Sequence, residues 1–426
     1  MKRTSFLLLT AFVLLASSLS AAAQKFQPKT IQFKGAPEYS DQELLAAAGL
    51  QKGTVLAFAD MKEHSQKLMD TGVFETLSFK FDGVDLIYTL VPHTDLYPVR
   101  LENLPLTPGK ELDAALHDRI PLYHGKIPTE GGLMESVRGA LEEMLAARGI
   151  KATVTAIPYT DQKLGKVTAM SFAITAPPVQ VGEIRPDGAT PTLDPKAMEI
   201  LVKLTGTPYD VEGSPNQIET YLGNYYRDKG YLEAAIRATP QNAPVVAPEA
   251  VHIPFMVSIS PGALYKLTGV QLAPGLLVTQ AEFDRQSHIH PGDIADGQHV
   301  TENWEFVARQ YHNKGYMQAR VLPTPSYDRA QGTVSFTVTA EPGPVYTMGK
   351  LTIENTADDL RAAMWAAWKL PTGAVFNEGA MRSYYAAQNP NSALGRTFAS
   401  ANCIYKLTLN DDTHTVDVSL RLERKH

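Results

Sequence analysis

A glycine that follows an amphipathic helical pattern recurs along this chain of 426 residues at intervals of about eighty residues. The positions are Gly72, Gly149, Gly230, Gly315 and, less clearly, Gly395. Glycine reaches the left-handed backbone conformation that commonly ends a helix, so each position predicts a helix end. Self-similarity at a fixed period is the sequence signature of a repeat architecture. We therefore expect five repeated units rather than one large core.

Proline and glycine at the ends of strand-like runs give a second set of unit boundaries. They occur at Val91-Pro92, Ala176-Pro177, Pro261-Gly262 and Pro342-Gly343. Together with the glycines they predict units at 27–93, 94–177, 178–260, 261–342 and 343–426. The fifth unit is expected to diverge, because Asn389-Pro390-Asn391 interrupts its second helix.

The fourth unit shows the expected order of elements most clearly. A helix-period run from Val300 to Tyr311 leads to Gly315, and strict alternation of apolar and polar residues follows at 334–339. Each unit reads strand, helix, helix, strand, strand. Two amphipathic helices laid across a three-stranded sheet bury its apolar face. The predicted fold class is α+β, with five tandem β-α-α-β-β domains in an elongated array.

Helix starts are marked by capping residues. Ser40 with Glu43, and Thr279 with Glu282, have the spacing of a capping box, in which each side chain bonds the other residue's backbone N–H. Asp194-Pro195 and Ser214-Pro215 place a capping residue before a proline at the first helical position.

Residues 1–23 have the form of a secretory signal peptide. Lys2 and Arg3 precede an apolar run from Phe6 to Ala16, and Ala21-Ala22-Ala23 forms a small-residue cleavage site. The apolar run is shorter than the roughly 20 residues that span a bilayer, although a retained anchor is the alternative. We expect export to a bacterial periplasm.

Composition excludes several classes of function. A net charge of −6 and a pI near 6.0 give no basic surface for nucleic acid. A single cysteine, Cys403, excludes an internal disulfide framework. After residue 24 no apolar stretch reaches membrane-spanning length, so no direct membrane span is expected.

Catalytic and metal-binding patterns are absent from the sequence. No Gly-x-Ser-x-Gly elbow, Walker-type phosphate loop or His-Glu-x-x-His occurs. A histidine cluster at His288, His290, His299 and His312 reads best as surface histidines, with a metal-dependent hydrolase as the alternative. We predict no enzyme activity, no cofactor and no metal.

The repeats resemble POTRA domains, the polypeptide-transport-associated repeats of the outer-membrane barrel assembly (BamA/TamA-like) superfamily. The resemblance covers about residues 27–426. It depends on the element order, on Ile31-x-Phe33-x-Gly35, on 39–45 (Tyr-Ser-Asp-Gln-Glu-Leu-Leu), and on Gly72-Val73-Phe74, Lys229-Gly230-Tyr231 and Lys314-Gly315-Tyr316. Members usually carry a C-terminal membrane barrel, and this chain stops after the repeats. We therefore expect a separately encoded barrel as partner.

The resemblance implies a periplasmic, non-enzymatic scaffold, associated with the outer membrane through partners, that receives unfolded outer-membrane proteins or accessory factors. In such domains the second strand is the exposed edge, where an extended client can pair through its backbone. By position these edges are 77–81, 152–156, 232–236, 317–321 and 405–409. The candidate peptide-binding residues are Leu232, Ala234, Ile236, Met317, Ala319 and Val321. The alternative is a structural adaptor of an envelope complex that binds no client.

Overall fold

The computed structural model describes residues 25–188, 193–354, 356–386 and 392–424. The expected signal peptide, residues 1–23, lies outside them, as does Asn389-Pro390-Asn391. Two compact units divide the chain. The first comprises residues up to Arg185 with Lys203–Pro215 and Pro240–Phe255, and the second comprises Pro186–Val202, Asn216–Thr239 and the residues from Met256 onward.

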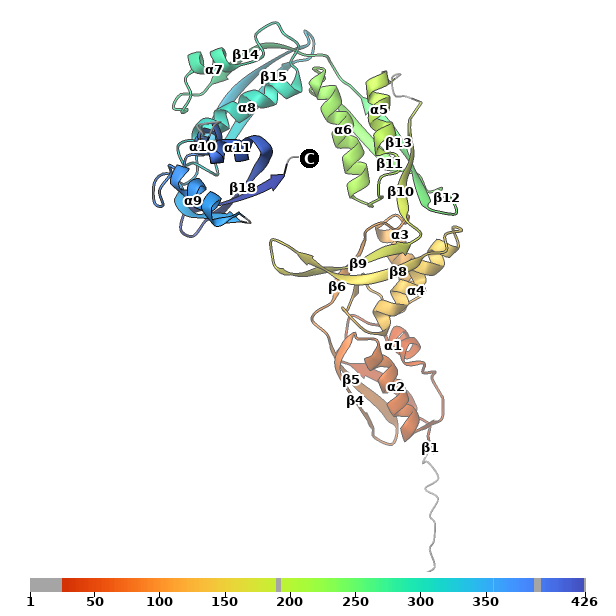
Figure 1. Ribbon diagram of the computed structural model, residues 1–426. Helices are drawn as coiled ribbons and strands as arrows, with labels where there is room; N and C mark the ends of the chain where they lie inside the picture. The colour runs from red at the N-terminus through yellow and green to blue at the C-terminus, as the bar shows by residue number, and fades with distance from the viewer. Residues whose placement is uncertain (1–24, 189–192, 355, 387–391, 425–426) are drawn as a thin grey trace, which may run out of the picture. The chain divides into compact units, whose positions relative to one another are not determined.

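The first unit begins with a three-stranded sheet in the order β2-β5-β4, in which β2 runs parallel and β4 antiparallel to β5. Its elements are β2 (Thr30–Lys34), α1 (Asp41–Ala48), α2 (Phe58–Asp70), β4 (Phe74–Phe81) and β5 (Asp85–Pro92). A short pair, β1 (Lys25–Phe26) and β3 (Leu56–Ala57), lies outside this sheet. Leu44 of α1, Leu68 of α2 and Tyr88 of β5 are buried. Figure 1 shows α1 and α2 beside β4 and β5.

The second sheet of this unit has the order β7-β6-β9-β8. Its elements are β6 (Tyr97–Leu101), α3 (Lys110–His117), β7 (Lys126–Ile127), α4 (Gly132–Ala146), β8 (Thr153–Asp161) and β9 (Lys166–Ala176). Again the first long strand, β6, pairs in parallel with β9, while β8 pairs antiparallel to β9.

The third sheet has the order β10-β13-β11, with the short β12 beside β13. Its elements are β10 (Val179–Pro186), α5 (Pro195–Leu204), α6 (Gly213–Asp228), β11 (Ala235–Pro240), β12 (Val245–Val246) and β13 (Val251–Ser260). The boundary between the two compact units falls within β13.

The second unit contains two further sheets, β14-β16-β15 and β17-β19-β18. The first has β14 (Lys266–Leu272), α7 (Gln280–Gln286), α8 (Gly297–His312), β15 (Arg320–Asp328) and β16 (Thr333–Glu341). The second has β17 (Thr347–Glu354), α9 (Asp358–Ala367), α10 (Gly379–Ala386), α11 (Ala393–Ser400), β18 (Ala401–Asn410) and β19 (Thr415–Arg424). Helix α11 is additional to the predicted order.

The capping signals mostly act as the sequence predicts. Ser40 and Thr279 each form the complete capping box. Asp194 caps α5 through hydrogen bonds of 3.0 Å from the backbone N–H groups of Lys196 and Ala197. The Ser214 prediction is wrong, because α6 begins one residue earlier, at Gly213. Asp210 instead accepts the N–H of Gly213 from outside the helix, and the Ser214 hydroxyl accepts the N–H of Asp210.

The recurring glycines end helices and also connect successive sheets. Gly230 and Gly315 have φ of 89° and 86°. The carbonyl of Gly230 accepts the N–H of Tyr265 at 3.0 Å, and that of Gly315 accepts the N–H of Tyr346 at 2.8 Å. Each tyrosine thereby fixes the start of the next sheet to the preceding helix end. Gly395 does not end a helix; it lies in the first turn of α11, where its N–H donates to Ser392.

Among the described residues, no helix combines the length and the apolar composition needed to cross a bilayer.

Candidate functional site

Each of these five sheets places its second long strand at an edge. The sheet orders end with β4, β8, β11, β15 and β18, as the resemblance implies. Along an edge strand the backbone N–H and C=O groups of alternate residues point away from the sheet. These outward-facing residues decide whether another strand can be added there.

Only two of the six predicted peptide-binding residues lie in an edge strand. Ile236 is in β11 and Val321 is in β15. Leu232 and Ala234 precede β11, and Met317 and Ala319 precede β15, because both strands begin three residues later than predicted.

A tight turn after each glycine-aromatic pair explains the late strand starts. The N–H of Ala234 donates to Tyr231 at 3.0 Å, and that of Ala319 donates to Tyr316 at 3.1 Å. These two donors are already bonded inside their own turns. The predicted positions at Ala234 and Ala319 are therefore not edge donors.

Prolines interrupt the outward-facing donors of β15. The carbonyl of Val338 accepts the N–H of Ala273, so Val338 faces β14 and its neighbour Thr339 faces β15. Thr339 pairs with Leu322, which therefore faces inward. By alternation the outward-facing residues of β15 are Val321, Pro323, Pro325 and Tyr327. Since proline has no N–H, half of these positions cannot donate to an added strand.

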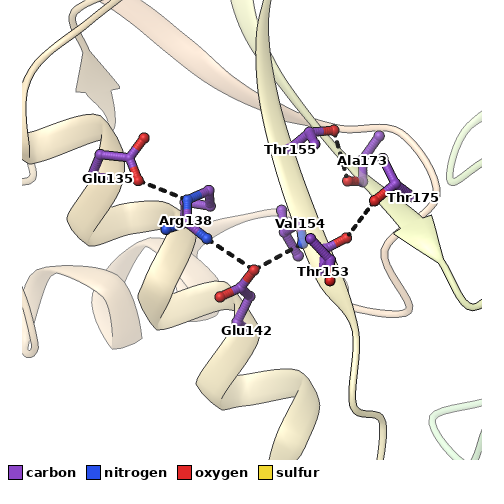
Figure 2. Close-up of polar contacts among 8 residues, drawn as sticks. All are labelled: Glu135, Arg138, Glu142, Thr153, Val154, Thr155, Ala173 and Thr175. Carbon is purple, nitrogen blue, oxygen red and sulfur yellow. Dashed lines mark hydrogen bonds and ion pairs between the residues drawn. The ribbon is translucent and has the colours of Figure 1, made fainter.

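Strand β8 combines a proline with a side-chain cap. The N–H and C=O of Ile174 bond Asn103 beside β6, so its partner Val154 faces outward on β8. The N–H of Val154 donates to Glu142 of α4 at 2.9 Å (Figure 2). Farther along the same edge, Pro158 has no N–H to offer.

Arg138 holds the Glu142 carboxylate in this position. Its guanidinium bonds Glu142 at 3.0 Å and Glu135 at 2.8 Å, so the three side chains form a chain along α4 that ends at the β8 edge (Figure 2). The hydrogen bond to Glu135 and the neighbouring carboxylates raise the pKa of Arg138. The Glu142 carboxylate is therefore held in place by a side chain of its own helix.

Strand β11 repeats this arrangement in another sheet. The N–H of Gln241, just beyond the end of β11, donates to the carbonyl of Pro254 in β13 at 2.8 Å, so the backbone of Gln241 faces inward. By alternation Ala238 and Pro240 face outward. The N–H of Ala238 donates to Glu219 of α6 at 2.9 Å.

Strand β4 keeps an uninterrupted series of outward-facing residues. The carbonyl of Val84 accepts the N–H of Lys29, so even-numbered residues of β5 face β2. Their partners on β4 are Leu77, Phe79 and Phe81, which therefore face the open edge. Strand β4 contains no proline, so all three positions carry an N–H donor.

Strand β18 also has an uninterrupted series of outward-facing residues, in a longer strand than β4. The carbonyl of His414 accepts the N–H of Thr347, which places even-numbered residues of β19 toward β17. Their partners Tyr405, Leu407 and Leu409 face outward, and β18 contains no proline. Tyr405 is 43% exposed and Leu409 is 36% exposed. On both β4 and β18, therefore, apolar residues accompany the outward-facing backbone.

Parts of the chain are similar in sequence to known proteins. The model of the POTRA family, described as a surface antigen variable number repeat, matches residues 266–343, which span the sheet β14-β16-β15. The chain is also 20% identical over 346 residues to the outer membrane protein assembly factor BamA of Buchnera aphidicola subsp. Acyrthosiphon pisum. That alignment covers 76% of this chain and 53% of the relative, so the chain spans about half the relative's length.

The sheet β14-β16-β15 is a POTRA-like domain. Solved structures similar to the chain include the third to fifth POTRA domains of Haemophilus influenzae BamA, with 16% identity and a TM-score of 0.43, covering 58% of this chain and 96% of that one. The first three POTRA domains of Anabaena Omp85 show 16% identity and a TM-score of 0.24, covering 58% and 95%.

The histidines singled out in the sequence do not converge. The rings of His288 and His299 lie 6.2 Å apart, while His312 bonds Glu378 at 2.8 Å and His290 lies 3.8 Å from Asp293. The fold instead brings His117 and His124 to Glu43. Sequence reasoning missed this group, because its members are 74 and 81 residues from Glu43.

The Glu43 carboxylate also belongs to the capping box of α1. Burial raises its pKa, but hydrogen bonds from the backbone and side chain of Ser40, and from His124, outweigh burial and lower the pKa overall.

Proposed function

We propose that this protein is a periplasmic, non-enzymatic module for assembly of outer-membrane proteins, and that it holds extended client segments at its edge strands. The POTRA match and the relative named as an assembly factor support the general role. In this proposal the chain carries five POTRA repeats, at 27–93, 94–177, 178–260, 261–342 and 343–426, and is exported through residues 1–23. Its partners are unfolded outer-membrane proteins and a separately encoded membrane barrel.

The observation that carries the proposal is the composition of β18. Its outward-facing residues Tyr405, Leu407 and Leu409 provide backbone donors and acceptors together with apolar side chains on one face. A strand added beside them places alternate side chains on that same face. Strands of outer-membrane barrels alternate apolar and polar residues, so such a strand matches this edge. β4 offers a shorter edge of the same kind, while Ile236 and Val321 remain single positions on interrupted edges.

A proline scan of β18 tests the proposal. Leu407→Pro removes an outward-facing N–H but leaves the inward ladder to β19 in place, and Lys406 before it is already extended as proline requires. We expect weaker photo-crosslinking of the full chain to a synthetic peptide with the alternating pattern of a barrel strand. Leu407→Ala, which keeps the N–H, is the matched control for side-chain loss. Equal crosslinking of Leu407→Pro and Leu407→Ala, with circular dichroism unchanged, would contradict edge pairing at β18.

The capped and proline-containing edges favour a second candidate, a structural adaptor that binds no client. Pro158, Pro240, Pro323 and Pro325 restrict pairing at three of the five edges. Affinity capture from envelope extracts separates the two functions. An adaptor recovers a few partners in fixed stoichiometry, whereas a client-binding module recovers many unfolded barrel proteins.

A further inference from the structure

Two histidines and a glutamate from separate elements meet inside the first compact unit. Glu43 lies in the first turn of α1, His117 is the last residue of α3, and His124 lies in the loop before β7. The Oε1 atom of Glu43 is 3.0 Å from Nε2 of His124 and 3.4 Å from Nε2 of His117. One ligand atom from each residue lies within 4.8 Å of the other two.

The His117 ring is oriented by a backbone carbonyl. Its Nδ1 atom is 2.9 Å from the carbonyl oxygen of Tyr123, which can only accept a hydrogen bond. Nδ1 therefore carries a proton, and Nε2 is the ring nitrogen that faces Glu43. Histidines that bind metals are commonly held by such a hydrogen bond from the other ring nitrogen.

The other two members are held independently. The Oε2 atom of Glu43 accepts the N–H of Ser40 at 2.6 Å, which leaves Oε1 directed at the histidines. The His124 ring packs edge-on against Tyr39 with centroids 4.9 Å apart. Each ligand thus has a fixed orientation before any ion binds.

We propose that Glu43, His117 and His124 bind a divalent transition-metal ion, with Zn²⁺ as the best match. Imidazole nitrogens and a carboxylate oxygen are zinc ligands, and tetrahedral bonds of about 2.0–2.1 Å place neighbouring ligand atoms roughly 3.3 Å apart. The separations of 3.0 Å and 3.4 Å from Glu43 are close to this size, so an ion can bind here by displacing the protons between these atoms. The side chains are 17%, 43% and 36% exposed for Glu43, His117 and His124, so water can supply the fourth ligand.

Such an ion joins α1, which lies between strands of the first sheet, to the end of α3 and the loop after it, which lie between strands of the second sheet. Because Glu43 belongs to the domain of the first sheet and the two histidines belong to the domain of the second, the bound ion restrains one domain relative to the other within the first compact unit. An ion that binds the folded form and not the unfolded form also raises the midpoint of thermal unfolding. The site is independent of the edge strands and of client binding.

Calorimetric titration of tag-free, chelator-treated full chain with zinc chloride tests the proposal. We expect one zinc ion per chain, with affinity reduced by roughly tenfold or more in His117→Ala and His124→Ala. Glu43→Gln keeps the capping acceptor for Ser40 but weakens the ligand, so its affinity should fall while its circular dichroism is unchanged. Co²⁺ in place of zinc should give the visible absorption of a tetrahedral site.

The double variant His288→Ala/His299→Ala is the matched control, since it removes two neighbouring histidines elsewhere. It should bind zinc as the unaltered chain does. The proposal is overturned if the unaltered chain binds no zinc, if both cluster variants bind it equally well, or if the control variant abolishes binding.

Discussion

The Glu142 carboxylate accepts the backbone N–H of Val154 at 2.9 Å, so a helix side chain occupies an edge-strand donor. Glu219 accepts the N–H of Ala238 at the same distance in the next sheet. On two edges, therefore, a carboxylate from the covering helix occupies one outward-facing N–H. Pro158 and Pro240 remove a second donor from each of these edges. The same domain architecture thus contains both restricted and unrestricted edges.

Removal of the Glu142 cap should expose Val154. Glu142→Ala leaves the N–H without its acceptor, so we expect faster amide hydrogen exchange at Val154 and a loss of about 1 kcal/mol in the free energy of local opening. Glu142→Gln keeps an acceptor and should lie between the two. The exposed neighbour Glu143 supplies the control, Glu143→Ala. Unchanged exchange at Val154 in Glu142→Ala would show that the cap protects nothing.

Restoring donors to β15 should create a binding edge. The double variant Pro323→Ala/Pro325→Ala adds two outward-facing N–H groups beside Val321 and Tyr327. If edge pairing determines client capture, crosslinking of an alternating peptide to β15 should increase. Thr324→Ala, at an inward-facing position, controls for the change in side chains. An identical crosslinking yield in the double variant and the control argues against pairing at this edge.

The glycines at helix ends differ in how closely they are packed. A Cβ atom on Gly315 would lie 2.8 Å from Val375 Cγ1 and 2.9 Å from the Tyr346 carbonyl oxygen, whereas on Gly149 it meets nothing within 4 Å among the described residues. Both have positive φ, at 86° and 79°. We expect Gly149→Ala to cost about 1 kcal/mol of unfolding free energy from backbone strain. Gly315→Ala should cost about 1–3 kcal/mol more from overpacking.

Two measurements check the glycine prediction. Denaturant unfolding gives the ranking of the two variants, and hydrogen exchange at the N–H of Tyr346, which bonds Gly315, reports the joint directly. Equal costs for Gly315→Ala and Gly149→Ala would show that the packing at Gly315 yields to an added methyl group.

Asp194 should contribute stability that is lost only in strong acid. Its carboxylate accepts hydrogen bonds from Lys229 at 2.6 Å, Tyr225 at 2.5 Å and the first turn of α5, and these hold its pKa well below the usual range. Since the folded-state pKa is depressed, the unfolded chain binds the proton more readily, and stability rises with pH in this window. The contribution is complete above about pH 4 and disappears as the pH falls through the folded-state pKa.

Two variants separate the cap from the charge at Asp194. Asp194→Ala removes both and should cost about 1 kcal/mol at neutral pH, while Asp194→Asn keeps an acceptor for the N–H groups of Lys196 and Ala197. The difference between Asp194→Asn and the unaltered chain should stay constant from pH 7 to about pH 5 and shrink below about pH 4. A difference that persists undiminished at pH 2–3 would contradict the assignment to charge.

The repeated spacing of glycines predicts most of the fold because helix ends and hairpins are local features. Gly72, Gly230 and Gly315 take the left-handed conformation that glycine alone adopts readily, and the order of elements follows from them. Gly395 misleads, because Ser392 before it is an N-cap, so the same residue type opens α11 instead of ending a helix.

The candidate sites were less predictable from the sequence. They depend on which residues of each edge strand face outward, and on contacts between residues that are distant in the sequence. Leu232 and Met317 follow the right glycines, yet the turn that delays each strand is set by one backbone bond. The prolines in β15 were a readable signal, since a strand proline must face away from its partner. By contrast, the contacts of Glu142 with Val154 and of Glu43 with His124 form only when the chain folds, and no local pattern in the sequence indicates them.

The joints at Gly230–Tyr265 and Gly315–Tyr346 are hydrogen bonds between main-chain atoms, and Tyr265 and Tyr346 in turn accept the N–H groups of Ala295 and Phe376 at 2.9 Å. Such a connector has a glycine on one side and a buried tyrosine on the other, whose hydroxyl bonds Glu233 or Asp411. Copying one repeat within a gene therefore copies a working linkage with it. Arrays of different length can arise in this way while their surfaces diverge.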